Sequence, residues 1–594
     1  MAGVISRPAR PAQARSRRQK AVPAAEAGGF FRYRRGRVTR RLLLSSLIAG
    51  ALACGHAAPA APDRATLILV GGDVVTNLPD RPRVTAVAIR GARILAIGDD
   101  AEVRALAGAD ARVIELRGRT VTVGLADGHC HLYGLGVASE HVNLRGQPSE
   151  AAAVAAVVAA AQGRPAGEWV EGRGWDQNPW GGAFPTKASL DAALGDLPVA
   201  LRRVDGHAVW VNSAVLKLAG VGKATPDPAG GKIIRDASGE PTGVLVDNAM
   251  ALIDATSPKA SPEARERRIR AAAAQAIAAG ITAVHEMGID DDTVAAYRRL
   301  AKAGELPLRV SAYLEGDAAH PEGLAERELE PDDGDDYFAL VGVKYFADGA
   351  LGSRGAALIA DYSDDPGNRG LYVTAPDVLD RAVGIAAKSG WQVATHAIGD
   401  AGVHATLDAY QHAIEANPGQ DLRLRVEHAQ VMTSDDIVRM GKLGVIASMQ
   451  PTHATSDMPW AEARLGPERI KGAYAWRRVL DAKGFIVAGS DFPVEDVSPL
   501  AGIYAAVTRT DAQGQPAGGW YPDQKLTLDE AIFAFTAAPA VAGFVEDYRG
   551  HLAPGMVADL TVYDRPLVAD HTLLDAHVDA TIVGGELVYE RGGE

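Results

Sequence analysis

The stretch VTVGLADGHCH, residues 121–131, is an apolar run that ends in two histidines with one cysteine between them. Side chains alternate between the two faces of a β-strand. We therefore expect His129 and His131 to point to one side of the strand. Cys130 is expected to point to the other side and to pack against a helix, without a ligand or redox role.

Seven further apolar runs follow along the chain and alternate with helical segments. This alternation favours βα units and a parallel sheet. With the first run they make eight strands, the number that closes a (β/α)8 TIM barrel of the α/β class. The seven runs are ITAVHEMG (281–288), LRVSAYLE (308–315), VGVKYFADG (341–349), WQVATHAIG (391–399), LRVEHAQ (424–430), VIASMQPT (445–452) and FIVAGSDFP (485–493).

Polar side chains gather where these runs give way to loops. Lys344 lies in the fourth run, His396 and His428 end the fifth and sixth, and Asp491 ends the eighth. The carboxyl ends of barrel strands converge on one face, so these side chains are expected to meet there. Imidazole nitrogens and carboxylate oxygens suit Zn²⁺, Fe²⁺, Mn²⁺ or Co²⁺, and the sequence does not choose among these ions.

Short β-patterns flank the barrel region at both ends. TLILVGGDVVT and AVAIRGARILAIGDD lie within 64–122, and MVADLTVYD and VDATIVGGELVYE lie within 550–594. Turn residues break these runs, which predicts one small β-sandwich domain formed from both termini. The barrel then occupies 123–549. Its segment 132–280 is too long for a loop and is expected to be an insertion with structure of its own after barrel strand 1.

Residues 1–63 are predicted to be an export signal and linker. Residues 1–53 hold 12 of the 61 Lys and Arg residues but one of the 74 acidic residues. Arg40 and Arg41 precede the apolar run LLLSSLIAGALA, which small residues and proline follow. This order is typical of a twin-arginine signal, so we expect export through the Tat machinery to the periplasm. A single N-terminal membrane anchor is the alternative, and Cys54 could carry lipid.

The body of the chain is acidic once this segment is set aside, which argues against nucleic acid as a partner. A small-molecule substrate is the expected partner. A homodimer is the default expectation for a soluble enzyme.

Several longer motifs resemble the amidohydrolase superfamily of metal-dependent hydrolases. They are most similar to its amidohydrolase-3 branch, the group similar to N-substituted formamide deformylase. The resemblance covers 64–594, and one departure is Val123, where the family usually has proline. The motifs are VKYFADGALGSRGAAL, THAIGDAGVHATLDAY, RVEHAQ and AGSDFPVE in the barrel, GRGWDQNPW, RRVDGHAVWVNSAVL and GEPTGVLVDNAM in the insertion, and HLAPGMVADLTVYD near the C-terminus.

The resemblance implies a role for each matching residue. Asp491 would be both a metal ligand and the general base and acid. Lys344 would react with CO₂ to give a carbamate that bridges two ions, although an ordinary ion-paired lysine is the alternative. One or two divalent ions are implied, with Zn²⁺ favoured. The implied ligands are His129, His131, Lys344, His396, His428 and Asp491.

Other polar or aromatic residues near the barrel ends are weaker candidates. His207, in the insertion, could approach the reaction centre and polarise a substrate carbonyl, so it is a second candidate catalytic residue. A core, capping or surface role is the alternative for each of the others. The candidate substrate-binding residues are Trp175, Asp176, His285, Asp348, Arg354 and His453.

These features predict an exported hydrolase that cleaves a linear, non-peptide amide bond by metal-activated water, with Asp491 moving the proton. Hydrolysis of a cyclic amide, lactone or ester on the same site is the chemical alternative. A non-catalytic exported binding protein is the alternative of another class.

Overall fold

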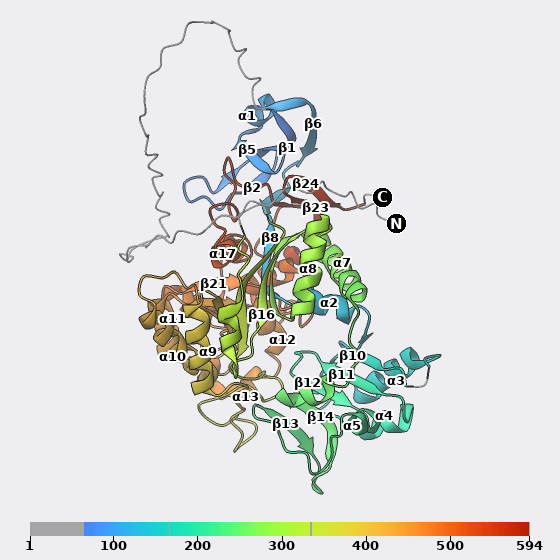
Figure 1. Cartoon of the computed structure of the whole chain (residues 1–594). Coiled ribbons are helices and arrows are strands. Elements are labelled where there is room, and N and C mark those ends of the chain that lie inside the picture. Colours follow the sequence, from blue (N-terminus) through green and yellow to red (C-terminus); the bar gives the residue numbers. More distant parts are fainter. Residues whose placement is uncertain (1–63, 166, 333–335, 593–594) are drawn as a thin grey trace, which may run out of the picture.

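The computed structural model describes residues 64–165, 167–332 and 336–592. Its centre is a sheet of eight parallel strands in sequential order, wrapped by helices (Figure 1), which confirms the predicted (β/α)8 barrel. The barrel strands are β8 (Leu125–Cys130), β15 (Ile281–Ile289), β16 (Arg309–Glu315), β17 (Phe338–Phe346), β18 (Gln392–Ala397), β19 (Arg425–His428), β20 (Ile446–Met449) and β21 (Phe485–Ala488).

The first and last barrel strands meet at a close seam. Just beyond β21, the N–H of Asp491 donates to the carbonyl of His129 at 2.8 Å. Gly128 permits this approach, because a Cβ at that position would lie 2.7 Å from the carbonyl oxygen of Ala488. The seam therefore places the polar ends of two strands that are far apart in sequence side by side.

The barrel helices are amphipathic segments with regular ends. In α8 (Asp291–Ala303) the Asp290 side chain accepts the N–H of Thr293, and Gly304 ends the helix in the left-handed conformation. Val294, Tyr297 and Leu300 form its buried stripe. Other helices around the barrel are α7 (Pro262–Ala278), α9 (Pro376–Lys388), α10 (Asp400–Ala416), α11 (Ser434–Leu443), α14 (Trp476–Asp481), α16 (Leu528–Ala534) and α17 (Ala537–Ala542).

Both ends of the described chain build two sheets that share one apolar core, at the top of Figure 1. Leu69 and Val121 from the first part pack in this core with Leu560 and Ile582 from the second part. The four-stranded sheet has the order β5 (Arg93–Gly98), β4 (Ala86–Arg90), β1 (Ala65–Val70), β6 (Ala107–Glu115). The six-stranded sheet has the order β24 (Glu586–Glu590), β23 (Val578–Val583), β22 (Leu560–Tyr563), β7 (Thr120–Val123), β2 (Asp73–Val75), β3 (Arg83–Val84).

The expected first barrel strand is in fact two strands. β7 pairs with β22 and β2 in the six-stranded sheet, while β8 pairs with β15 in the barrel. Gly124 lies between them, and its N–H donates to the carbonyl of Asp559 at 2.8 Å. The apolar run 121–131 therefore crosses from one domain into the other.

The insertion forms a domain of its own below the barrel in Figure 1. The helices α3 (Glu150–Ala161), α4 (Lys187–Leu194) and α5 (Ser213–Leu218) accompany its sheet. Neighbouring residues of one strand of this sheet lie in two separate apolar clusters. Leu201 is in one cluster and Ala200 is in the other. The sheet has the order β13 (Gly231–Arg235), β14 (Pro241–Asp247), β12 (Ala208–Val211), β11 (Val199–Arg203), β10 (Val170–Trp175), β9 (Val142–Asn143).

The expected bounds of the insertion, 132–280, are too wide at both ends. α2 (Leu132–Ala138) and α7 pack on the barrel, where Leu135, Ile269 and Ala276 share a core with Val284 of β15. These apolar side chains cover the barrel sheet, so the helices that carry them belong to the barrel.

The predicted export signal and Cys54 lie outside the described residues, so both stay predictions. Within 64–165, 167–332 and 336–592, no helix is long and apolar enough to cross a membrane.

Candidate active site

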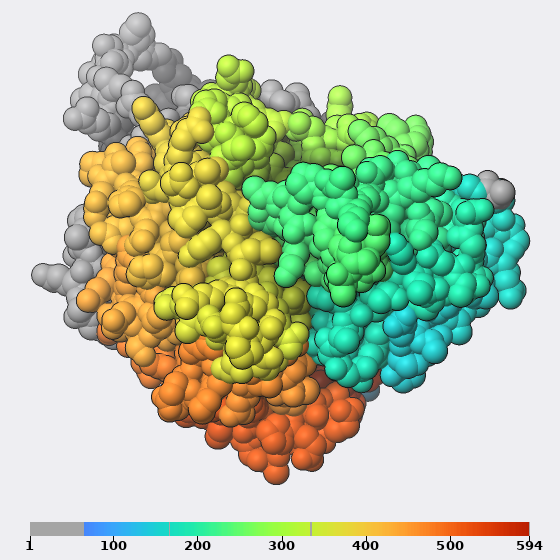
Figure 2. Space-filling view, turned by 90° about the horizontal axis from the view of Figure 1, so that it is seen from below, coloured from blue at the N-terminus to red at the C-terminus, as the bar shows by residue number. Residues whose placement is uncertain are grey.

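A cavity of about 780 Å³ lies between the carboxyl ends of the barrel strands and the inserted domain. His131 and Asp491 line it from the barrel, and Arg173, Arg203 and His207 line it from the insertion. Figure 2 views the molecule from the side of the insertion, with the green and cyan inserted domain packed beside yellow loops that follow β17. The barrel and the insertion therefore both contribute to one site.

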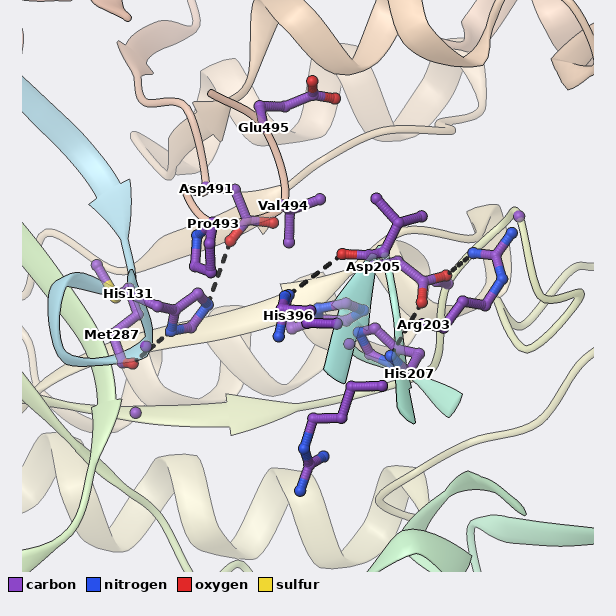
Figure 3. Close-up of a pocket in the computed structure, with 18 of the residues that line it drawn as sticks. His131, Arg203, Asp205, His207, Met287, His396, Asp491, Pro493, Val494 and Glu495 are labelled. Carbon is purple, nitrogen blue, oxygen red and sulfur yellow. Dashed lines mark hydrogen bonds and ion pairs between the residues drawn. The ribbon is translucent and has the colours of Figure 1, made fainter. Parts of the chain in front are cut away.

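The seam between β8 and β21 brings together a first group of metal-binding side chains. Ligand atoms of His129, His131 and Asp491 lie within 4.8 Å of one another. His131 Nε2 is 3.2 Å from Asp491 Oδ1, and His129 Nε2 is 3.5 Å from the same oxygen. A dashed line in Figure 3 marks the contact between His131 and Asp491. As the strand alternation predicted, both histidines face this centre, whereas Cys130 is fully buried in the core between barrel and helices.

Each of three histidines is oriented by an acceptor at its Nδ1. His129 Nδ1 is 2.6 Å from Glu427 Oε2, His131 Nδ1 is 2.9 Å from the carbonyl of Met287, and His428 Nδ1 is 2.8 Å from Gln450 Oε1. Such bonds fix the ring and leave Nε2 as the free lone pair. These three side chains therefore present Nε2 as a ligand atom.

A second group shares Asp491 with the first. Ligand atoms of His428, His453 and Asp491 lie within 4.8 Å of one another. The rings of His396 and His428 are 4.6 Å apart between centroids. His453, expected to contact substrate, thus lies among candidate ligands, whereas His396 is near this group without being part of it.

The donor set fits a divalent ion. Asp491 Oδ1 and His453 Nε2 are buried and make no hydrogen bond to any described residue. Burial lowers the pKa of His129 to about 4 and holds the pKa values of His396 and His428 well below the ordinary value, so these rings are neutral. Neutral imidazoles that converge on a buried carboxylate oxygen are the chemistry that such an ion binds.

Lys344 lies in β17 beside these groups, as predicted for barrel strand 4. Its side chain is buried, and its Nζ is 3.5 Å from His129 Nε2. Burial lowers the pKa of Lys344 to about 8. A substantial fraction of this amine is therefore neutral near physiological pH.

The backbone is strained at two of these positions. His428 has a φ of 70° and Asp491 a φ of 60°, in the left-handed region that disfavours side chains with a Cβ. Such strain costs roughly 1–3 kcal/mol per residue and concentrates at functional sites.

A buried ion pair that the sequence reading missed lies beneath the histidines. Arg425 Nε donates to Glu427 Oε1 at 2.8 Å, and Arg425 Nη2 donates to the carbonyl of Gly128 at 2.7 Å. Although burial opposes ionisation, Arg425 and His129 hold the pKa of Glu427 well below its usual range. Two charged residues at positions i and i+2 of an apolar strand, RVEH, were the signal available in the sequence.

His285 belongs to this buried layer and not to the cavity wall, which corrects its expected role in substrate binding. Strand β15 continues to Ile289, so His285 lies in the middle of the strand. Its Nδ1 is 2.6 Å from Arg425 Nη1, and burial followed by repulsion from Arg425 keeps its pKa well below the ordinary value. The neutral ring accepts a hydrogen bond from the guanidinium.

Three other expected substrate contacts also lie away from the cavity wall. Trp175 is fully buried in the apolar core of the inserted domain. Asp348 is fully buried and accepts the N–H of Ile398 at 2.9 Å, where it braces the loop after β18. Arg354 pairs with Asp364 at 3.0 Å. All three side chains are therefore engaged in packing, hydrogen bonding or ion pairing within the chain and do not face the cavity.

Asp176 and His207 do line the cavity, as expected. Asp176 Oδ1 accepts Arg203 Nη2 at 2.5 Å. His207 lies beside His396 in Figure 3, with 4.8 Å between ring centroids. The insertion thus brings a histidine against a barrel histidine.

Asp247, at the end of β14, is a further site residue that the sequence reading missed. Its Oδ1 is 2.7 Å from His207 Nδ1, while Oδ2 is buried with no hydrogen-bond partner among the described residues. Its backbone is strained, with a φ of 49° and a ψ of −128°. Gly349 leaves room for the carboxylate, because a Cβ there would lie 2.5 Å from Asp247 Oδ2. The neighbouring loops are therefore shaped to hold this carboxylate against His207.

Comparison with known proteins adds an independent observation. The sequence model of the amidohydrolase family matches residues 112–589. The Arabidopsis thaliana protein LONG AFTER FAR-RED 3 is 34% identical over 538 residues, which cover 88% of this chain and 92% of the relative. N-substituted formamide deformylase from Arthrobacter pascens is 30% identical over 548 residues, which cover 89% of this chain and 99% of that enzyme.

The fold has counterparts among solved structures. The crystal structure of an uncharacterized metal-dependent hydrolase from Pyrococcus horikoshii superimposes with a TM-score of 0.67. The two sequences are 28% identical, and the match covers 84% of this chain and 97% of the other.

Proposed function

The chain belongs to the amidohydrolase family of metal-dependent hydrolases that act on carbon–nitrogen bonds, and from this premise we propose that it cleaves a linear, non-peptide amide. The similarity to the N-substituted formamide deformylase of Arthrobacter pascens supports this substrate class. The observation that carries the proposal is Asp491, a buried carboxylate shared by both candidate ligand groups, with one oxygen that has no hydrogen-bond partner in the described chain.

His129, His131, His428 and Asp491 would hold one or two divalent ions, with Zn²⁺ the proposed metal. Such an ion, when bound, lowers the pKa of water and polarises a carbonyl oxygen. His396 and His453 flank these side chains and would complete the ligand set.

Asp491 is proposed to move the proton of the reaction. Although burial opposes ionisation, His131 and His129 hold the pKa of the Asp491 carboxyl well below its ordinary value, so the group is ionised at neutral pH. Asp491 Oδ2 lies 3.7 Å from His453 Nε2. The backbone N–H of Asp491 donates to the carbonyl of His129 at 2.8 Å. The side chain is thus fixed where it can take a proton from water and later give it to the leaving amine.

His207 is proposed to act on the substrate from the opposite wall. The hydrogen bond from Nδ1 to Asp247 fixes the ring, and in its protonated form the ring also carries a proton on Nε2 that can be donated to a substrate oxygen. Although burial opposes protonation, Asp247 raises the pKa of His207. Asp247 is therefore a positioning residue that fixes the ring and favours its role as a donor.

Lys344 is proposed to carry a carbamate. Its neutral amine attacks CO₂, a C–N bond forms as one C–O π bond opens onto oxygen, and one proton leaves to solvent, so that a neutral amine becomes an anion. The depressed pKa and the position beside His129 support this step. An anion at this place would complement the divalent ions that the family requires.

The first test is turnover by metal-loaded protein. We expect hydrolysis of at least one N-substituted formamide or N-acyl amine, a fall of more than about 10²-fold on chelation, and recovery on adding Zn²⁺. The panel includes cyclic amides, lactones and esters. Full turnover by metal-free protein, or turnover confined to lactones and cyclic amides, would contradict the proposal, and binding without turnover would favour the non-catalytic alternative.

A second test concerns Asp247. The substitution Asp247→Asn keeps the shape of the side chain, and asparagine tolerates a positive φ, but the negative charge beside His207 is lost. We expect kcat to fall about 10–100-fold with little change in KM or metal content.

The control is the double variant with His207→Ala. If Asp247 acts through His207, then Asp247→Asn causes no further loss of kcat when His207 is absent. Additive losses in the double variant would show that Asp247 has a structural role only.

A further inference from the structure

Three arginines of neighbouring strands β10 and β11 lie in the cavity wall, and one of them lacks an acidic partner. Arg202 forms an ion pair with Asp254 at 2.5 Å, and Arg203 forms one with Asp205. Arg173 lies directly opposite Arg202 in the parallel register. Within the described chain, Arg173 has no carboxylate at ion-pair distance. Within the described chain, two of these three strand arginines therefore have acidic partners and Arg173 has none.

The guanidinium of Arg173 has unused donors. It carries five N–H donors, but within the described chain its side chain makes one hydrogen bond, from Nη2 to the carbonyl of Val204 at 3.2 Å. Its Nε is buried and has no partner among the described residues. Burial and then repulsion from Arg202 lower the pKa of Arg173 to about 10, so it stays charged at neutral pH. A shielded cation without an anion is unfavourable, and a ligand can supply the missing charge.

Arg145 lies beside it and, among the described residues, is also free of acidic partners. A Cβ at Gly174, the residue after Arg173, would lie 2.7 Å from the backbone nitrogen of Arg145. The Arg145 guanidinium donates to the carbonyls of Pro493 and Val494 at 2.6 and 2.5 Å. Arg145 therefore joins this part of the wall to the loop that follows Asp491, and both arginines line the same cavity.

The two arginines lie close to the reaction centre. A Cβ at Gly206 would lie 3.4 Å from Arg173 Nη2. Gly206 precedes His207, whose ring contacts His396. A group bound to Arg173 would thus be next to the histidine that faces the substrate, on the same wall of the cavity.

We propose that Arg173, assisted by Arg145, binds a carboxylate of the substrate, and that the amides cleaved are therefore N-acyl amino acids or similar carboxylate-bearing amides. A planar carboxylate matches the paired donors of a guanidinium. Asp205 and Asp254 would repel a bound carboxylate little, because Arg203 and Arg202 already neutralise them. This inference rests on the proposed function, since it names the substrate class of that site.

The test compares matched substrates. A panel of N-formyl and N-acetyl amino acids is assayed with metal-loaded protein, each compound beside its own primary amide, which lacks the negative charge. We expect kcat/KM to be about 10–100-fold higher for the acids. In Arg173→Gln this preference should fall to a ratio near one. Arg202→Gln is the matched control, because it changes the neighbouring arginine, which Asp254 already pairs, and should keep most of the preference.

Arg173→Lys separates charge from geometry, and it should keep part of the preference. Equal kcat/KM for acid and amide in the unmodified protein, or an undiminished preference in Arg173→Gln, would overturn the inference while the proposed function stands. If neither series is hydrolysed, the proposed function fails, and calorimetric titration with N-acetyl amino acids and their amides then decides the carboxylate site: weaker binding of the acids by Arg173→Gln supports it, and equal binding overturns it.

Discussion

Asp491→Asn is expected to lower kcat by about 10⁴-fold, the largest effect of any single substitution in this protein. Asparagine has nearly the same shape as aspartate, but its amide cannot take up the proton of an attacking water. Asp491 is the member common to both candidate ligand groups, so no other described carboxylate is placed to replace it in both. Substrate KM is expected to change little, because the substrate contacts proposed above lie on the opposite wall.

The measurement is kcat at saturating substrate together with the metal content of the purified variant. Asp496→Asn is the matched control, since Asp496 is an exposed residue of the same loop outside the cavity wall. A variant that retains its metal and loses activity assigns proton transfer to Asp491. An Asp491→Asn variant with unchanged kcat would contradict proton transfer by Asp491.

The barrel was predictable because its strands are buried on both faces. Parallel strands covered by helices read as continuous apolar runs, which the sequence shows eight times. The same continuity concealed the boundary between the β-sandwich and the barrel. Val123 and Leu125 belong to different sheets, although the apolar run does not break between them. The bounds of the insertion failed for a related reason. An amphipathic helix such as α7 shows which face it buries but not which sheet it covers.

The site was predictable where the barrel rule applies. His129 lies one residue before the end of β8, His428 ends β19, and parallel strands bring these ends to one face. His285 shows the limit of the rule, because its strand continues four residues further and leaves the ring below that face. Asp247 and Arg173 could not be assigned from the sequence, because their significance depends on the inserted domain folding back over the barrel. No pattern in the sequence indicates this contact between the inserted domain and the barrel.

Lys344→Met is expected to remove metal as well as activity. Methionine fills a similar volume in β17 but cannot react with CO₂, so no carbamate forms. We expect the variant to lose at least one bound ion per chain and kcat to fall about 10²–10³-fold. Metal is measured by elemental analysis of the purified protein. Lys302→Met is the control, since Lys302 is an exposed lysine on α8 and its replacement should change neither quantity.

Bicarbonate distinguishes a carbamate from an ordinary buried lysine. Protein stripped of metal and kept free of CO₂ should regain little activity with Zn²⁺ alone and much more when bicarbonate is added. Burial lowers the pKa of Lys344 to about 8, so much of the amine is neutral at pH 8 and nearly all of it is protonated at pH 6. Recovery should therefore be faster at pH 8 than at pH 6. Full recovery without bicarbonate would contradict the carbamate. If Lys344→Met also kept its metal, Lys344 would have no part in holding the ions.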